Sequence, residues 1–315
     1  MAELKSVLCR DLGIRYPFFQ GGMAYMSTAE LASAVSNAGG LGLLCSSGLK
    51  AEQVHEEIVR CKQLTHKPFG VNLMLQSPEI DQIVEDLIAE GVGVVTTGAG
   101  SPERLMPKLL AAGVKVIPVI PNVRAAKKMA ALGAYAVVVE GTESGGHVGE
   151  MTTLALLPQV LAAVDIPVLA AGGIANGRTI AAMLLLGAVG VQMGTIFMVA
   201  DECPISDLYK QLVLEAADTD TIVTGRGTSH VVRALRTPMV LKYAELEKQP
   251  DSEAALEKLA ERGLPKAMSG DLEGGCFMAG QIAGLIKRRA AAAQIIEELN
   301  REAIAALEKA GGLLG

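Results

Sequence analysis

The sequence predicts an α/β fold, a (β/α)8 TIM barrel with a smaller cap domain inserted near the C-terminus. Eight short apolar runs alternate with amphipathic segments over roughly the first 200 residues, and the runs are continuously apolar. Such strands, separated by helices, indicate a parallel sheet that is buried on both faces. Eight strand–helix units match a closed barrel. The rhythm changes after this point, which indicates that a further, smaller domain is inserted there.

The predicted strands are short, and clear helices lie between several of them. The first helix, within residues 27–39, is expected to begin at a Ser/Thr cap before Glu30 and to end at glycine. Two further helices are expected at residues 51–64 and 78–91. The eight predicted strands are residues 16–20, 40–44, 69–75, 92–98, 114–120, 134–140, 167–173 and 190–195.

An open, doubly wound sheet is the alternative to the barrel. That fold would place a GxGxxG dinucleotide-binding turn after the first strand. The chain instead has FQGGMAYMST at this point, and the barrel is therefore preferred. We expect residues 1–204 to form the barrel and residues 205–273 to form the cap. Residues 274–315, an apolar segment followed by a charged helix, are expected to pack back on the barrel.

Composition excludes several classes of protein. Half of the 315 residues are hydrophobic and only 3% are aromatic, so aliphatic side chains must fill the core. The formal net charge is −6 with both signs mixed along the chain, which argues against a nucleic-acid partner. The five cysteines lack CxxC spacing, which favours a reduced, cytoplasmic location over a disulfide scaffold or a metal site.

Two segments were considered as targeting or membrane signals. The charged N-terminal stretch shows no secretory pattern. Residues 181–200 are apolar enough to suggest a membrane span. Glycines and Gln192 interrupt this stretch, so it is expected to form a helix end, a turn and a buried strand, with no membrane partner.

Two glycine-containing loops follow the last two predicted strands, where barrels often bind phosphate. The first is AAGGIANGR, in which Gly172 and Gly173 allow close approach to the backbone and NGR opens a helix. The second is QMGT, which contributes Gly194 and Thr195. These glycines could simply make tight turns. Their occurrence after both strands favours a phosphorylated cofactor or substrate.

His147 lies in the glycine-rich loop EGTESGGHVG after the sixth predicted strand. This loop should bring the imidazole over a flat ligand at the rim. The ordinary histidine pKa of about 6.5 suits proton donation near neutral pH. His55 and His66 are expected at the surface, and His230 is expected in the cap without a special role. Other polar residues at predicted strand ends, which could serve the site or only the backbone, are Gln20, Asn72, Thr96, Thr97 and Glu140.

These motifs together resemble a known family over nearly the whole chain. They include FQGGMA, KPFGVNLML, VVTTGAG, EGTESGGHVG, VLAAGGIANGR, VQMGTIF and GDLEGGCFMAGQIAGLI. The sequence resembles the FMN-dependent enoyl-[acyl-carrier-protein] reductases of type II, within a wider group that includes the nitronate monooxygenases. TTGAG, EGTESGGHVG and the C-terminal motif favour the reductases. Val119 and Met74 also favour the reductases, because nitronate monooxygenases often carry Lys or Thr at these positions.

The resemblance implies FMN at the top of the barrel and His147 as the active-site histidine. NADH or NADPH would reduce the flavin in a ping-pong cycle, and trans-2-enoyl-ACP would then be reduced to acyl-ACP. His147 would donate a proton or stabilise the enolate. The resemblance implies that the following residues bind the cofactor: Gly22, Met23, Ala24, Asn72, Glu140, Gly145, Gly146, Ala171, Gly172, Gly173, Gln192, Met193, Gly194 and Thr195.

The same resemblance suggests partners. Acyl carrier protein is acidic, so Arg226, Arg233 and Arg236 are the expected basic contacts near the mouth of the site. Met239 and Met278 are candidates for covering the acyl chain. A homodimer is expected, and a monovalent cation is possible, although no cluster of ligands fixes a site for it.

Two other functions are compatible with these motifs. A nitronate monooxygenase would share FMN and His147 and would use O2. A phosphate-binding isomerase or aldolase would have the same barrel without a flavin, but the sequence offers no Schiff-base lysine on a barrel strand.

Overall fold

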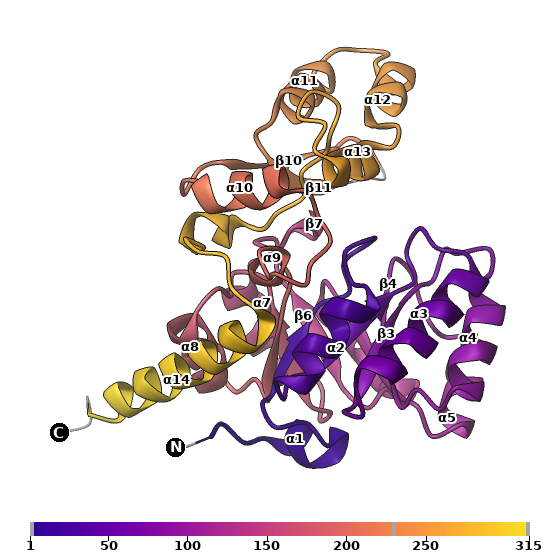
Figure 1. Cartoon of the computed structure of the whole chain (residues 1–315), viewed down its shortest axis with the longest axis vertical. Helices are drawn as coiled ribbons and strands as arrows, with labels where there is room; N and C mark the ends of the chain where they lie inside the picture. The colour runs from indigo at the N-terminus through magenta and orange to yellow at the C-terminus, as the bar shows by residue number, and fades with distance from the viewer. Residues whose placement is uncertain (1–2, 229–230, 313–315) are drawn as a thin grey trace.

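The computed structural model describes residues 3–228 and 231–312, which form a barrel with a smaller cap above it (Figure 1). Eight parallel strands follow the order β1-β9-β8-β6-β5-β4-β3-β2. A parallel bridge between Phe19 and Leu41 joins the two outermost strands of this order. The predicted (β/α)8 fold is confirmed. The strands are β1 (Phe18–Gln20), β2 (Gly42–Cys45), β3 (Phe69–Met74), β4 (Val94–Gly98), β5 (Lys115–Ile120), β6 (Val137–Glu140), β8 (Val168–Ala171) and β9 (Gly190–Met193).

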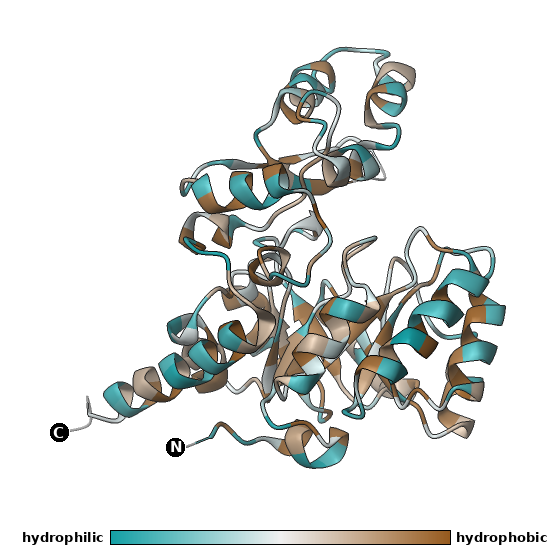
Figure 2. Cartoon of the chain, in the orientation of Figure 1, coloured by the Kyte–Doolittle hydropathy of each residue, from teal (hydrophilic) through white to brown (hydrophobic). Residues whose placement is uncertain are grey.

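Helices surround the barrel and cover the outer face of its sheet. Their apolar sides face the strands and their polar sides face outward, as the colours of Figure 2 show. Leu31, Ile58 and Leu87 lie on such inward sides and are fully buried. The helices are α1 (Val7–Leu12), α2 (Ala29–Asn37), α3 (Ala51–Leu64), α4 (Ile80–Ala89), α5 (Met106–Ala111), α6 (Val123–Ala131), α7 (Thr153–Leu161) and α8 (Gly177–Leu185).

Helix α2 is not capped in the way that the sequence predicts. Thr28 occupies the N-cap position, but its buried hydroxyl has no partner among the described residues. The carboxylate of Glu57 on α3 instead accepts a hydrogen bond from the Ala29 N–H at 2.6 Å. Glu79 does the same for Ala51 at the start of α3, also at 2.6 Å. A carboxylate from the next unit thus satisfies each helix start and suits its positive end.

The cap contains helices and a small antiparallel sheet. Its sheet has the order β10-β11-β7, and β7 (Gly146–His147) comes from the loop after β6. Ala234, Met239 and Val240 form a separate apolar cluster there. The remaining elements of the chain are α9 (Thr195–Met198), α10 (Asp207–Glu215), β10 (Thr221–Thr224), β11 (Val232–Leu235), α11 (Pro238–Leu246), α12 (Glu253–Ala260), α13 (Gly263–Ser269), the 3-10 helix η1 (Gln281–Leu285) and α14 (Ala292–Gly311).

The C-terminal region contacts both parts of the molecule. Phe277 packs edge-on against Tyr209 of α10, with ring centroids 4.8 Å apart, and its carbonyl accepts a hydrogen bond from Leu235. Met278 forms a bridge with Ala234 of β11. Residues 277–278 therefore pack with the cap. Helix α14 lies along α8 of the barrel instead.

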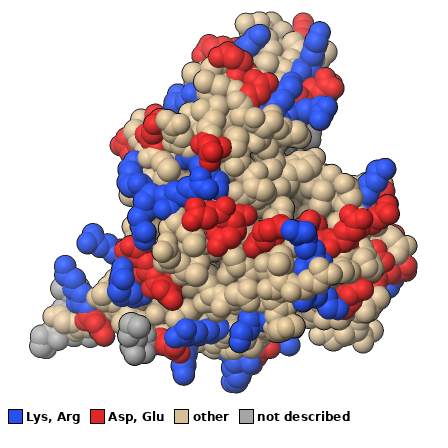
Figure 3. All heavy atoms as spheres, viewed as in Figure 1, with Lys and Arg blue, Asp and Glu red and all other residues tan. Residues whose placement is uncertain are grey.

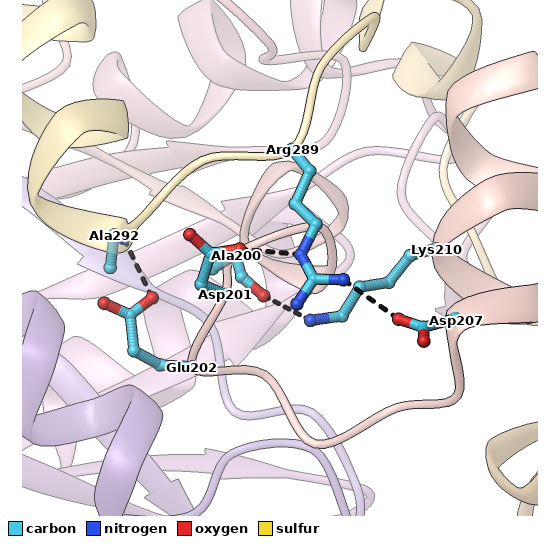
Figure 4. A network of polar contacts seen from close by, with 7 residues as sticks. All are labelled: Ala200, Asp201, Glu202, Asp207, Lys210, Arg289 and Ala292. Atoms are coloured by element: carbon cyan, nitrogen blue, oxygen red, sulfur yellow. Dashed lines mark hydrogen bonds and ion pairs between the residues drawn. The ribbon is translucent and has the colours of Figure 1, made fainter.

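The chain enters and leaves the cap at adjacent points. Ala200 and Ala290 form a parallel bridge, and the Asp201 N–H donates to the Ala290 carbonyl at 3.1 Å. The Arg289 guanidinium contacts Asp201 at 2.6 Å and Asp207 at 2.9 Å (Figure 4). These ion pairs link the two crossings to the first cap helix.

A buried lysine reinforces this junction. Lys210 of α10 is only 3% exposed, and its ammonium donates to the Ala200 carbonyl at 2.6 Å (Figure 4). Burial lowers the pKa of Lys210 from its ordinary value. Glu202 also accepts a hydrogen bond from the Ala292 N–H at the start of α14, at 2.9 Å.

The apolar stretch at residues 181–200 forms part of the barrel. It comprises most of the second half of α8, strand β9 and helix α9, as expected from its glycine breaks. Over residues 3–228 and 231–312, no helix combines the length and the apolar composition needed to cross a membrane.

Candidate active site

The glycine loops after β8 and β9 lie side by side at the carboxyl ends of their strands, because Ala171 pairs with Gln192. Gly172 and Gly173 have φ angles of +88° and +73°, which favour glycine. In these two loops, the backbone N–H groups without an acceptor among the described residues include those of Gly173, Ile174, Gly194 and Thr195. Unpaired N–H groups that converge at one place form an anion-binding surface.

A side chain next to these loops also lacks a partner. The Oε1 atom of Gln192 is buried and accepts no hydrogen bond from the described residues. Buried polar groups of this kind usually find a partner. The loops and Gln192 therefore fit a phosphate-bearing ligand with polar groups beside the phosphate.

The NGR segment opens helix α8 as predicted, with Asn176 at the N-cap position, but the N–H groups at this helix end already have partners within the chain. The Asn176 side chain accepts hydrogen bonds from the N–H groups of Arg178 and Thr179, both at 3.1 Å. The Gly177 N–H donates to Glu302 of α14 at 3.0 Å. A Cβ on Gly177 would lie 2.2 Å from the Ala303 nitrogen, so this glycine serves the packing of α14.

The loop after β1 adjoins the ends of β3 and β9. A Cβ on Gly22 would lie 2.2 Å from the Cβ of Asn72, so glycine is required for this close approach. The Asn72 amide donates to Thr96 at 2.8 Å. A Cβ on Gly194 would lie 3.5 Å from the Met23 sulfur. The expected residues of three separate strand ends are thus neighbours, with Ala24 half-buried in the same loop.

Gln20 has a structural role. Its amide nitrogen donates to the Ser27 hydroxyl at 2.7 Å and to the Gly21 carbonyl. Its amide oxygen accepts a hydrogen bond from the Leu43 N–H at 3.1 Å. This side chain satisfies backbone groups between β1 and β2. The sequence left open whether Gln20 serves the site or only the backbone, and in the structure it serves the backbone.

Two carboxylates lie at the end of β6. Burial raises the pKa of Glu140 to about 7, although part of its side chain remains exposed. Glu143 was missed by the sequence analysis. Its carboxylate accepts hydrogen bonds from the Thr153 N–H at 3.0 and 3.1 Å and from the Thr153 hydroxyl at 3.1 Å. Its place three residues after Glu140, within the glycine-rich loop, was the available signal.

His147 lies at the contact between barrel and cap. Its backbone pairs with Val232 of β11, and Gly146 pairs with Arg233. The side chain of His147 is exposed. A Cβ on Gly145 would lie 2.6 Å from the carbonyl carbon of Ala279, so the loop packs closely against the C-terminal segment as well.

Two residues with left-handed backbones occur in loops after barrel strands and were not predicted. Tyr25, in the loop after β1, has φ 62° and is 37% exposed. Its ring lies over Gly48, where a Cβ would be 2.2 Å away. Ala99, directly after β4, has φ 57°. Such strained conformations in residues other than glycine are concentrated near functional sites.

The expected substrate-facing residues divide into different environments. Arg226 and Arg236 are exposed, whereas Arg233 is buried and cannot offer a surface contact to a protein partner. Met239, the other candidate for covering the acyl chain, is buried in the core of the cap. Met278 is half-buried, with its sulfur 3.6 Å from the position of a Cβ on Gly146.

The remaining histidines and charges add little to this site. His66 is exposed, the side chain of His55 is 42% exposed, and His230 lies outside the described residues. The face in Figure 3 shows acidic and basic side chains interspersed over barrel and cap. Two surface depressions lie beside α3 and near the start of several barrel strands, away from the strand ends that carry His147.

Fold and site together define a capped (β/α)8 barrel with two adjacent glycine loops and a histidine loop at the strand ends. The model of the family described as nitronate monooxygenase matches residues 5–87 and 79–302. The chain belongs to this family and is an oxidoreductase.

Named relatives differ in their activities. The chain is 34% identical, over 99% of both sequences, to the (3aS,4S,5R,7aS)-5-hydroxy-7a-methyl-1-oxo-octahydro-1H-indene-4-carboxyl-CoA dehydrogenase of Mycobacterium tuberculosis. It is 31% identical to a probable nitronate monooxygenase of Staphylococcus saprophyticus, over 76% of this chain and 81% of that protein.

Solved structures resemble both barrel and cap. FabK from Thermotoga maritima is 43% identical with a TM-score of 0.96, over 98% of this chain and 99% of that one. A nitroalkane oxidase from Streptomyces ansochromogenes is 29% identical with a TM-score of 0.86, over 95% of this chain and 99% of that one.

Proposed function

We propose that this protein is an FMN-dependent enoyl-thioester reductase that uses NADH or NADPH, with enoyl-ACP as substrate. The observation that carries the proposal is the likeness to FabK, an enoyl-ACP reductase II, which extends through the cap that covers the site. The likeness to the nitroalkane oxidase is lower in both identity and TM-score. A relative that aligns over 99% of both sequences is named for a CoA thioester, which also favours a thioester substrate.

The residues fit FMN. Backbone N–H groups of Gly173, Ile174, Gly194 and Thr195 would hold its phosphate, since they donate to no described residue. Gln192 has a buried acceptor to offer. The close approach of Gly22 to Asn72 leaves flat, side-chain-free backbone beside the ring system. The other positions that the family resemblance implies would complete the cofactor site: Met23, Ala24, Glu140, Gly145, Gly146, Ala171, Gly172 and Met193.

When bound, FMN would accept a hydride from the nicotinamide and deliver it to the β-carbon of the enoyl group. The chain's own contribution is centred on His147. Its imidazole would give a proton to the α-carbon or donate a hydrogen bond to the thioester oxygen as negative charge develops there. Exposure of the side chain allows exchange of protons with solvent. Met278, beside Gly146, would contact the acyl chain, and the exposed Arg226 and Arg236 would face the acidic carrier protein.

The test uses the purified protein with its flavin. Absorbance should show flavin bands that bleach on anaerobic addition of NADH or NADPH. Addition of crotonyl-ACP or crotonyl-CoA should then restore them with formation of the saturated thioester. A reduced flavin that ignores both thioesters would refute the reductase activity, and comparison of the two carriers would identify the preferred one.

Nitronate oxidation is the second candidate, because the family model and a named relative carry this activity. It would be supported if the flavin ignored the thioesters but turned over a nitronate with O2. A protein that bound no flavin after reconstitution would contradict both candidates.

A further inference from the structure

Arg233 of the cap strand β11 is a buried cation directly beside the histidine loop. The residue is only 6% exposed, and its backbone pairs with Gly146, next to His147. A buried guanidinium is costly unless its N–H groups are paired. The partners of Arg233 therefore show what the residue stabilises.

These partners lie on both sides of the contact between barrel and cap. Nε donates to the Thr142 carbonyl, in the loop after β6, at 3.0 Å. Nη1 donates to the Thr221 hydroxyl of β10 at 3.0 Å. Glu143 adds a favourable negative charge nearby, which counteracts the lowering of the Arg233 pKa by burial. One rigid side chain thus connects the loop to two strands of the cap.

Backbone pairing holds the same loop farther along. The Val148 N–H donates to the Val231 carbonyl at 3.2 Å, and His147 pairs with Val232. Two-residue pairing of this kind is weak by itself. The Arg233 side chain adds a fixed point at Thr142, on the opposite side of His147 from Val148. The segment that carries the imidazole is therefore held at both ends.

We propose that Arg233 is a positioning residue that fixes the loop of residues 141–149 against the cap and so sets the place of His147. The kinetic part of this inference rests on the proposed enoyl reduction, whereas the structural part does not. Lysine cannot replace Arg233, because a single ammonium lacks the planar fork that reaches two separate acceptors.

The first experiment is hydrogen–deuterium exchange of the full chain, comparing Arg233→Gln and Arg233→Lys with the unchanged protein. Peptides covering residues 142–150 should exchange at least about tenfold faster in both variants, since local opening becomes easier. Arg236→Gln is the matched control. It lies three residues along and is exposed, and its guanidinium donates to the Thr219 carbonyl, away from the histidine loop, so exchange of that loop should be unchanged.

The second experiment is a double-mutant cycle with His147→Ala. Arg233→Gln should lower kcat for enoyl reduction by about 10- to 100-fold through misplacement of the imidazole. Added to His147→Ala, it should lower kcat by less than about twofold, because both changes remove the same contribution. If kcat of the double variant fell by the product of the two single-variant losses, the proposal would be overturned.

The proposal would also be overturned if residues 142–150 exchanged at the same rate in Arg233→Gln as in the unchanged protein. If Arg233→Gln does not fold, Arg233→Lys carries both experiments. If the protein reduces no enoyl thioester, the exchange measurement still decides whether Arg233 holds the loop.

Discussion

The backbone of His147 pairs with that of Val232, so a residue that follows a barrel strand completes the antiparallel sheet of the cap. The imidazole is therefore placed by the cap as well as by the barrel. Any movement of β11 relative to the barrel would alter the distance between His147 and a ligand held at the strand ends.

Replacement of His147 should separate chemistry from binding. His147→Ala should lower kcat by about 10²- to 10⁴-fold, the usual contribution of a positioned acid or base. The β7 pairing uses backbone atoms, which alanine retains, so the flavin-to-protein ratio should be preserved. His55→Ala, which removes an exposed histidine far from the site, should leave kcat unchanged. Equal activity of the two variants would remove His147 from the mechanism.

Gly173 and Gly113 form a matched pair for testing the phosphate loop. Both have φ +73°, so alanine should strain either backbone by about 1–2 kcal/mol. A Cβ would meet only ordinary contacts at 3.6 Å in Gly173 and nothing within 4 Å in Gly113. Gly173→Ala should weaken FMN binding at least about tenfold, because a strained backbone at this position displaces the N–H groups of the loop. Gly113→Ala should lower the stability of the protein without changing its affinity for FMN. Fluorescence titration of the apoproteins with FMN measures the difference, and equal affinities would exclude Gly173 from the phosphate site.

The sequence predicted the barrel well because each strand carries its own signal. All eight apolar runs became strands, and the glycines after β8 and β9 mark two adjacent loops. What it could not predict depends on partners far along the chain. Glu302 occupies the start of α8, and Arg233 turns inward to Thr142. Nothing near Asn176 or Arg233 in the sequence reveals these contacts, since charged residues are most often exposed.

Glu140 should make the stability of the apoprotein depend on pH. Its pKa of about 7 in the folded state lies above the ordinary value of 4.5, so the folded form holds its proton more tightly. The free energy of unfolding should therefore fall as pH rises from about 4.5 to 7. Glu140→Gln should remove this penalty, raising stability at pH 8 by about 1–3 kcal/mol and changing it little at pH 5.

Urea unfolding of the apoproteins at the two pH values measures this effect. Glu150→Gln, at an exposed site in the same region, serves as the control and should show no such gain. A gain of equal size at pH 5 and pH 8 would show that the Glu140 charge is not its cause.

The junction of Figure 4 should depend more on its buried bond than on its exposed ion pairs. Lys210→Met keeps the aliphatic packing but leaves the Ala200 carbonyl without its donor, which should destabilise the protein by about 1–3 kcal/mol. Arg289→Gln removes two ion pairs whose side chains are at least 45% exposed, and it should cost less than about 1 kcal/mol. Urea unfolding compares them, and the reverse order would contradict this ranking.

The bridge between Ala200 and Ala290 also bears on how such proteins diversify. Because the chain leaves and rejoins the barrel at neighbouring points, a foreign segment of another length could be spliced in without stretching the scaffold. Recombination at this one place would exchange the substrate-facing part and retain the ancestral barrel. A successful graft would have to bring one thing with it, a strand edge against which Gly146 and His147 can align.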